Sequence, residues 1–230
     1  MKNDLYEIDY EFIYEDGSRM AFNIGLDRKT ITYQRKESQT KPEWARLENE
    51  QCSNCSLRKE EHPYCPICLN IGELVEAFRG MLSTGNCTVI CTTEERTFSK
   101  ETSTQVGLFS IFGIIMATSN CPVIHLFKPM ARFHLPFSSI EETMVRTASY
   151  YLLRQYFEYK KGKVPDIDLK KLDQYYSNIQ IVNQGILARI TNLVEKDAEM
   201  NAIVILNSLA QMFNLEFDES LDSLEYLFTC

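Results

Sequence analysis

The sequence predicts an α+β protein: an N-terminal antiparallel sheet, then a four-cysteine zinc knuckle, then a mostly α-helical body. Polar and apolar side chains alternate through much of the first 35 residues, which is typical of half-buried strands. Two Cys-x-x-Cys pairs follow, and from residue 138 onward apolar residues recur at helical spacing. We expect N-terminal strands at 1–50, the knuckle at 51–69 and the helical body at 70–230, which can fold as one continuous domain.

Composition indicates a globular protein and disfavours some classes of function. Of the 230 residues, 44% are hydrophobic and 24% are charged, so a sizeable core is expected rather than disorder. The 24 basic and 32 acidic side chains give a net charge of −8, which argues against a protein that coats nucleic acid. Residues 69–165 are mildly basic, with 10 basic and 8 acidic side chains, whereas residues 166–230 carry 4 and 11. Docking of these two parts, or binding of an external anion, would explain the difference.

No targeting or membrane-spanning segment is expected. The first nine residues are acidic and lack an apolar stretch of signal-peptide length. The longest uninterrupted apolar run, at residues 111–117, is about a third of the length that a spanning helix needs. We therefore expect a cytoplasmic protein without membrane insertion.

The N-terminal region is expected to form an antiparallel meander. Asp16-Gly17 is a strong hairpin-turn signal, because glycine accepts the positive φ that such a turn requires. The three expected strands cover residues 6–14, 19–24 and 30–34. A polar loop at 36–42 leads to the cysteines.

Two helices and a β-hairpin are expected between the cysteine pairs and residue 138. Leu74, Val75 and Phe78 share one face of the first expected helix. Pro122 marks the end of the second. The expected elements are a helix at 69–82, strands at 87–93 and 96–100, and a helix at 103–118. Residues 122–136 hold too many prolines for a long element, and we expect an ordered apolar loop there.

From residue 138 onward the pattern is helical. Two Ser-x-x-Glu pairs within residues 138–142 have the spacing of a capping box, and Gly162 marks the expected end of that helix. Residues 150–153 are all apolar, so we expect this helix to lie centrally in the fold. A last helix is expected at 198–213, whereas the tail after residue 215 has no clear assignment.

The helix expected at 168–196 carries a heptad seam, with Asn183 at one a-type position. The seam consists of Leu169, Leu172, Tyr176, Ile179, Asn183, Ile186, Ile190 and Leu193. It predicts either a face of an intramolecular bundle or a homodimer through the 169–193 heptad seam.

Four of the eight cysteines give the strongest chemical signal. Cys52 and Cys55 form one Cys-x-x-Cys pair, Cys65 and Cys68 the other, and nine residues separate the pairs. The two-residue spacing lets a tight turn aim two thiolates at one ion, and soft thiolates suit zinc. Four sulfur ligands leave no open position, so we expect a structural Zn²⁺ that braces strands against helices. A redox dithiol pair and an iron–sulfur cluster are the alternatives; His62, between the pairs, is expected to be exposed.

A second candidate site lies where the 122–136 loop enters the following helix. A helix N-terminus beside basic side chains can hold an anion, because the dipole and the side chains act with the same sign. The candidate anion ligands are Lys128, Arg132, His134, Ser138 and Ser139. The expected ligand is a phosphorylated small molecule. The alternative is structural: Arg132 would pair with Glu141, Glu142 or the acidic C-terminal part.

No enzyme template fits the chain, and we assign no catalytic residue. G-x-S-x-G, a glycine-rich phosphate loop and H-E-x-x-H are all missing from the sequence. Cys121 with His125 or His134 is a weak candidate for a thiol nucleophile and base, and His134 with Glu142 for an acid–base pair. No nucleic-acid partner is expected.

About half of the chain, 44–159, resembles a family of uncharacterised bacterial proteins. Three features carry the resemblance: the two cysteine knuckles, MATSNCP at 116–122, and KPMARFHLPFSSIEET at 128–143. The resemblance implies a bacterial, cytoplasmic setting and no known activity. We therefore expect a non-enzymatic, zinc-stabilised interaction or regulatory module that binds another bacterial protein. An anion- or nucleotide-sensing domain is the alternative, and an enzyme of unknown class the third.

Overall fold

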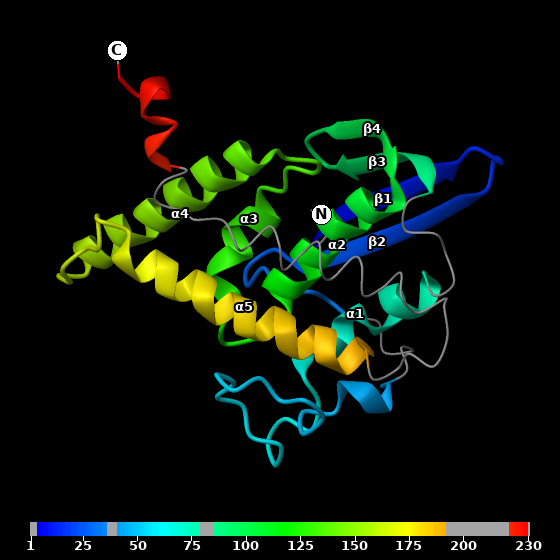
Figure 1. The fold of residues 1–230 in the computed structure, drawn as a ribbon, viewed down its shortest axis with the longest axis horizontal. Coiled ribbons are helices and arrows are strands. Elements are labelled where there is room, and N and C mark those ends of the chain that lie inside the picture. Colours follow the sequence, from blue (N-terminus) through cyan, green and yellow to red (C-terminus); the bar gives the residue numbers. More distant parts are fainter. Residues whose placement is uncertain (1–3, 36–40, 79–84, 192–220, 230) are drawn as a thin grey trace.

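A four-stranded antiparallel sheet forms one layer of the protein (Figure 1). The computed structural model describes residues 4–35, 41–78, 85–191 and 221–229. The strands are β1 (Leu5–Tyr14), β2 (Arg19–Asp27), β3 (Asn86–Thr93) and β4 (Thr97–Ser103), in the order β2-β1-β3-β4. Because β1 pairs with both β2 and β3, the N-terminal strands and the 86–103 hairpin share one sheet.

The alternation predicted for β1 is confirmed. Tyr6, Ile8, Tyr10 and Phe12 are buried on one face, whereas the acidic residues between them point outward. The helices cover the buried face, so the sheet is polar on one side and packed on the other. The α+β class and an antiparallel sheet that begins at the N-terminus therefore agree with the prediction.

The prediction of a third meander strand at residues 30–34 is wrong. Residues 30–34 make only an isolated bridge between Leu26 and Tyr33, and the Tyr33 amide donates to the carbonyl of Thr118 at 3.0 Å. The second edge of β1 is taken by β3, which comes much later in the chain. Local alternation shows neither that 30–34 makes a single isolated bridge to β2 nor that β1 pairs with β3, because strand pairing depends on the tertiary fold.

The helices follow the sequence pattern closely. They are α1 (Pro66–Ala77), α2 (Thr104–Thr118), the short α3 (Lys128–Arg132), α4 (Ile140–Lys160) and α5 (Lys170–Thr191), with 3-10 turns η1 (Glu43–Ala45), η2 (His125–Phe127) and η3 (Glu225–Leu227). α2 is apolar around most of its circumference and packs between the sheet and the helices α1 and α3. In the described residues, no helix combines the length and apolarity needed to cross a membrane.

Helices α4 and α5 form a hairpin that extends away from the sheet (Figure 1). Ser139 and Glu142 make the predicted capping box at the start of α4, whereas the Ser138 hydroxyl bonds to Thr143 instead. The central position expected for α4 is wrong in its second half, where Leu153 and Phe157 are about half exposed. An apolar run alone therefore did not indicate burial.

The heptad seam of α5 packs inside the chain. Its described positions Leu172, Ile179, Ile186 and Ile190 are buried, as is Asn183. Their burial within the single chain favours the intramolecular bundle face. The homodimer through the 169–193 heptad seam stays a prediction. Leu193 and the helix expected at 198–213 lie outside the described residues.

Candidate functional site

The two cysteine pairs lie on different local structures. In the first pair, the Cys55 amide donates to the Cys52 carbonyl at 2.9 Å and closes a tight turn. In the second pair, Cys65 is the N-cap of α1 and Cys68 lies in its first turn. The positive end of the α1 dipole favours negative charge, so this position favours thiolates.

The four sulfurs form one group of interacting thiols. A hydrogen bond donated by the Cys68 thiol lowers the pKa of Cys65 to about 6. Burial raises the pKa of Cys52 to about 11 and that of Cys68 well above its ordinary value, and the charge on Cys65 raises both further. In the described part of the chain, no three His, Cys, Asp or Glu side chains converge closely enough to hold a metal ion. His62, as expected, is exposed.

A buried arginine accompanies these thiols. Arg189 is only 1% exposed and forms no ion pair with a carboxylate of the described residues. Its guanidinium donates to four backbone carbonyls, those of Ala45 (3.5 Å), Arg46 (2.7 Å), Leu47 (2.9 Å) and Glu50 (3.2 Å). Its charge also acts on Cys52, Cys65 and Cys68 in the direction that favours their thiolates. Buried charges are normally compensated by charges of the opposite sign, and Cys65, whose pKa is lowered to about 6, can supply one here as a thiolate.

Helix α5 is held directly against the first cysteine pair. A Cβ atom at Gly185 would lie 2.6 Å from the Cys52 sulfur, so only glycine allows this close approach. The Asn54 side-chain amide also donates to the Asn178 carbonyl at 2.9 Å. The first cysteine pair thus contacts α5, and the loop that follows it leads to the start of α1.

The structure gives each residue of the expected anion site its own partners. Lys128 donates to the Thr30 carbonyl. Among the described residues, Arg132 pairs with Glu95 at 3.5 Å rather than with Glu141 or Glu142. The remaining contacts are those of Arg132 with the Tyr6 ring, of His134 Nε2 with the Tyr10 hydroxyl (2.5 Å), of Ser138 with Thr143, and of Ser139 with the α4 N-terminus. The five side chains are therefore engaged within the protein, at different places.

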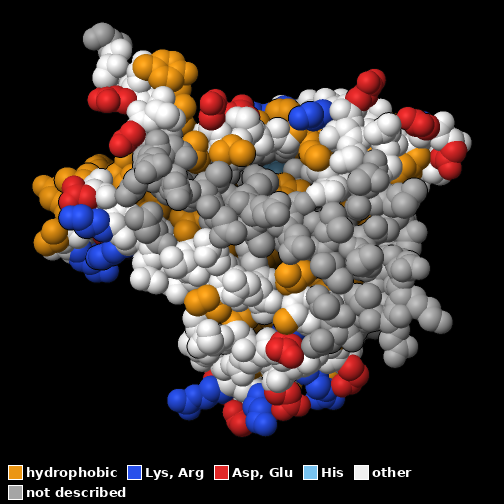
Figure 2. All heavy atoms as spheres, viewed as in Figure 1, with side chains coloured by type: hydrophobic (Ala, Val, Ile, Leu, Met, Phe, Trp, Pro, Cys, Tyr) orange, Lys and Arg blue, Asp and Glu red, His pale blue; other side chains and the backbone are white. Residues whose placement is uncertain are grey.

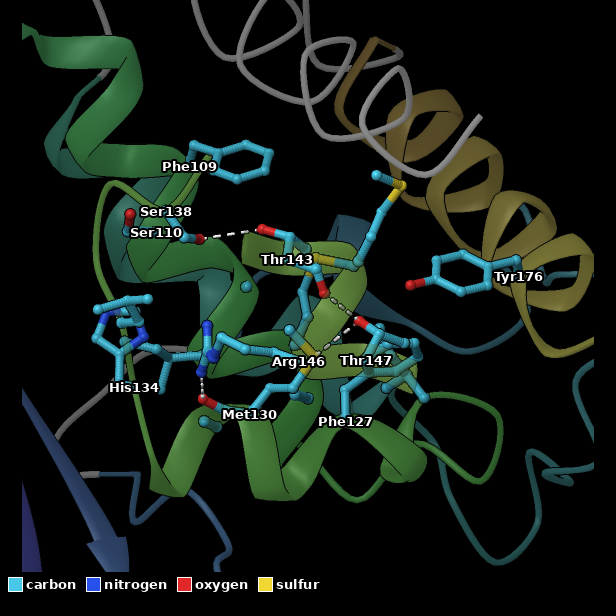
Figure 3. A pocket seen from close by; sticks show the side chains of 18 residues that line it. Phe109, Ser110, Phe127, Met130, His134, Ser138, Thr143, Arg146, Thr147 and Tyr176 are labelled. Atoms are coloured by element: carbon cyan, nitrogen blue, oxygen red, sulfur yellow. Dashed lines mark hydrogen bonds between the residues drawn. The ribbon is translucent and has the colours of Figure 1, made fainter. Parts of the chain in front are cut away.

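Two of them, His134 and Ser138, line a cavity of about 120 Å³ between α2, α3 and α4 (Figure 3). Most of its wall is apolar, with side chains such as Ile114 and Met144. The polar side chains at the wall are those of Ser110, His134, Ser138, Thr143, Arg146, Thr147 and Tyr176. Desolvation lowers the pKa of His134 to about 3, and the nearby charge of Arg146 adds to the shift. The imidazole is therefore neutral at pH 7.

The weak enzyme candidates do not gain support from the geometry. Burial raises the pKa of the Cys121 thiol, which is the opposite of what an activated nucleophile needs. His125 Nδ1 lies 2.6 Å from the carbonyl of Pro122, and Glu142 accepts the Ser139 amide in the capping box.

Apolar side chains gather at the end of the molecule where α4 and α5 meet, beside lysines (Figure 2). We call this set the hairpin surface. It consists of Leu153, Tyr156, Phe157, Tyr159, Val164 and Ile167, each between 51% and 90% exposed. Lys160, Lys161 and Lys163 lie among them and are also exposed. A set of large, exposed apolar side chains of this kind is typical of an interaction site.

A family model described as a domain of unknown function (DUF6901) matches residues 8–229. The chain belongs to this family. The match extends well beyond the 44–159 resemblance inferred from the sequence, and it names no activity. No curated protein and no solved structure matches the chain.

The sequence did not point to Arg189 as part of a site within this DUF6901 chain. Its carbonyl partners lie 139 to 144 positions away. Every residue has a backbone carbonyl, so the sequence does not indicate which of them accept a hydrogen bond. The one available signal was weak: Arg189 is a charged residue next to Ile190, a position of the apolar seam.

Proposed function

We propose that this protein is a non-enzymatic, zinc-stabilised module that binds another protein through the hairpin surface. The observation that carries the proposal is the exposure of six large apolar side chains at the far end of the α4–α5 hairpin. Burying them against a partner would remove apolar area from water, and the aromatic rings would be the main anchors.

The chemistry of the cysteine cluster supports bound zinc. It offers four sulfur donors, and the buried Arg189 would offset part of the double negative charge of a zinc ion held by four thiolates. The ligands would be Cys52, Cys55, Cys65 and Cys68, drawn together around the ion. Full sulfur coordination leaves no position for a substrate, so the ion would supply structure alone.

The proposed zinc would connect three parts of the fold. The 51–65 loop has no regular secondary structure, and its ends lead from η1 to the start of α1 while Cys52 touches α5. Metal binding would hold this loop in shape, because a segment with so little core of its own needs another source of stability. The hairpin surface would then be presented by a rigid body.

The partner would carry an acidic, apolar face. Lys160 lies over the Tyr156 ring at 5.8 Å, and Lys161 and Lys163 both pair with Glu158. Exposed basic side chains at the rim of an apolar patch steer partners of opposite charge. We place this interaction in the bacterial cytoplasm, because the seven described cysteines are free thiols.

Site-specific photocrosslinking in the native host tests the interaction. A photoreactive residue at Tyr156 should trap a discrete protein, whereas one at Glu101, exposed on β4, should not. The double variant Leu153→Glu, Phe157→Glu, combined with the Tyr156 probe, should lose the product, and Tyr226→Glu, at an exposed aromatic of η3, should keep it. Identical products from both probe positions, or none from Tyr156, would refute the proposal.

Sensing of a phosphorylated ligand or nucleotide through Lys128, Arg132 and His134 is the second candidate function. It is favoured by the accessibility of Arg132, whose side chain is 28% exposed and whose contact with Glu95 is long. Such a ligand would have to replace Glu95 at the guanidinium. ATP and inorganic phosphate should then raise the melting temperature of the wild type but not of Arg132→Ala, and no shift in either protein would exclude this candidate.

A further inference from the structure

The cavity between α2, α3 and α4 is open at one wall because of a glycine. Gly113 is exposed although Phe112 and Ile114 beside it are buried, and a Cβ atom there would have nothing within 4 Å. Glycine within a helix costs about 1 kcal/mol relative to alanine. At this position it leaves space next to the apolar wall.

A single cation lies at the polar side of this space. The Arg146 Nη2 atom donates to the Phe133 carbonyl at 2.7 Å and to the Met130 carbonyl at 3.4 Å. The Arg146 guanidinium also lies 6.0 Å from the Tyr150 ring. Within the described residues, its other nitrogens have no hydrogen-bond partner and no carboxylate pairs with it. Figure 3 shows Arg146 on the same side of the cavity as His134, which is neutral.

We propose that this cavity binds a small apolar molecule with one carboxylate group, such as an aryl or short-chain aliphatic acid. The carboxylate would bind Arg146, whose planar guanidinium matches a carboxylate through two parallel hydrogen bonds. The hydrocarbon part would lie against α2 and α3. The volume of about 120 Å³ suits a ligand near the size of benzene, which binds in apolar cavities of about 150 Å³.

This site is separate from the zinc cluster and from the hairpin surface, so neither earlier proposal depends on it. It shares His134 with the second candidate function but uses neither Lys128 nor Arg132. Gly113 and Arg146, on which the proposal depends, both line the cavity.

Isothermal titration of the purified protein with phenylacetate and hexanoate tests the proposal, with phenylacetamide and hexanamide as neutral counterparts. The wild type should bind at least one of the two acids saturably, about tenfold more tightly than its amide, because a charge-assisted hydrogen bond is gained. Arg146→Met should remove that preference and Arg146→Lys should restore part of it. Gly113→Leu, which fills the cavity, should abolish binding of acid and amide alike.

Arg154→Met is the matched control. Arg154 also lies on α4 and is similarly half-buried, but its guanidinium lies 6.0 Å from the Tyr175 ring and outside the cavity wall. The Arg154→Met variant should bind the two acids as tightly as the wild type does. Absence of saturable acid binding, or equal binding by the wild type and a folded Gly113→Leu variant, would overturn the proposal.

Discussion

At the scale of single residues, Arg189 is the most informative side chain. Its guanidinium is buried, its hydrogen bonds within the described residues all go to backbone carbonyls, and its charge acts on three of the four clustered thiols. A cation in such a place joins α5 to the chain segment that leads into the first cysteine pair. Its contribution can be measured directly, because the chain also contains arginines at its surface.

We expect Arg189→Met to lower the free energy of unfolding by about 3 kcal/mol, because it leaves several buried carbonyls without donors. Arg19→Met is the control, since the Arg19 side chain is 63% exposed and pairs with Glu11 at the surface. That change should cost less than about 1 kcal/mol. Urea unfolding at pH 7 measures both, and equally small losses would show that Arg189 does not stabilise the fold.

His134 predicts how stability depends on pH. Desolvation, with the charge of Arg146, lowers the pKa of His134 to about 3 in the folded protein, whereas an unfolded histidine titrates near pH 6.5. Below pH 6.5 the unfolded chain therefore binds more protons, and stability falls as the pH drops toward 3. The wild type should lose up to about 1.4 kcal/mol per pH unit more than His134→Gln over this range. His62→Gln should follow the wild type, and parallel profiles for all three proteins would contradict the prediction.

At the scale of elements, two glycines in helices should respond in opposite ways. A Cβ atom at Gly185 would meet the Cys52 sulfur, whereas one at Gly113 would meet nothing. We expect Gly185→Ala to destabilise the protein by about 1–3 kcal/mol, since overpacking outweighs the better helix propensity. Gly113→Ala should stabilise it by up to about 1 kcal/mol. Melting curves of the two variants measure this, and stabilisation by Gly185→Ala would mean that α5 does not approach the cysteine pair closely.

The elements also show how far local pattern determines structure here. Alternation located β1, and helical spacing located α2 and α4 to within a few residues, because their apolar faces are complete within each segment. The 30–34 segment lies beside β2, as a meander requires, but makes only the isolated Leu26–Tyr33 bridge there and does not continue as a strand. The exposure of Leu153 was not predicted, since an apolar run reads the same whether it faces a core or a partner.

At the scale of the whole molecule, residues distant in sequence build the candidate sites. The cysteine spacing identified the four candidate zinc ligands, but the contact of Cys52 with α5 and the burial of Arg189 arise only in the fold. Arg132 and His134 are two positions apart in the sequence and have separate partners: Glu95, in the turn between β3 and β4, and Tyr10 of β1. The partners of these two candidate anion ligands are therefore set by the tertiary structure, which their spacing in the sequence does not reveal.

The central claim is that zinc held by four cysteines fixes the 51–65 loop to the rest of the protein. The most direct measurement is the zinc content per chain by mass spectrometry after purification, together with the melting temperature before and after a strong chelator. We expect one zinc per chain, a lower melting temperature after chelation, and loss of zinc in Cys52→Ser, Cys55→Ser. Cys87→Ser, which changes a buried cysteine of β3, should keep its zinc. A metal-free wild type whose melting temperature responds neither to zinc nor to chelator would contradict the account.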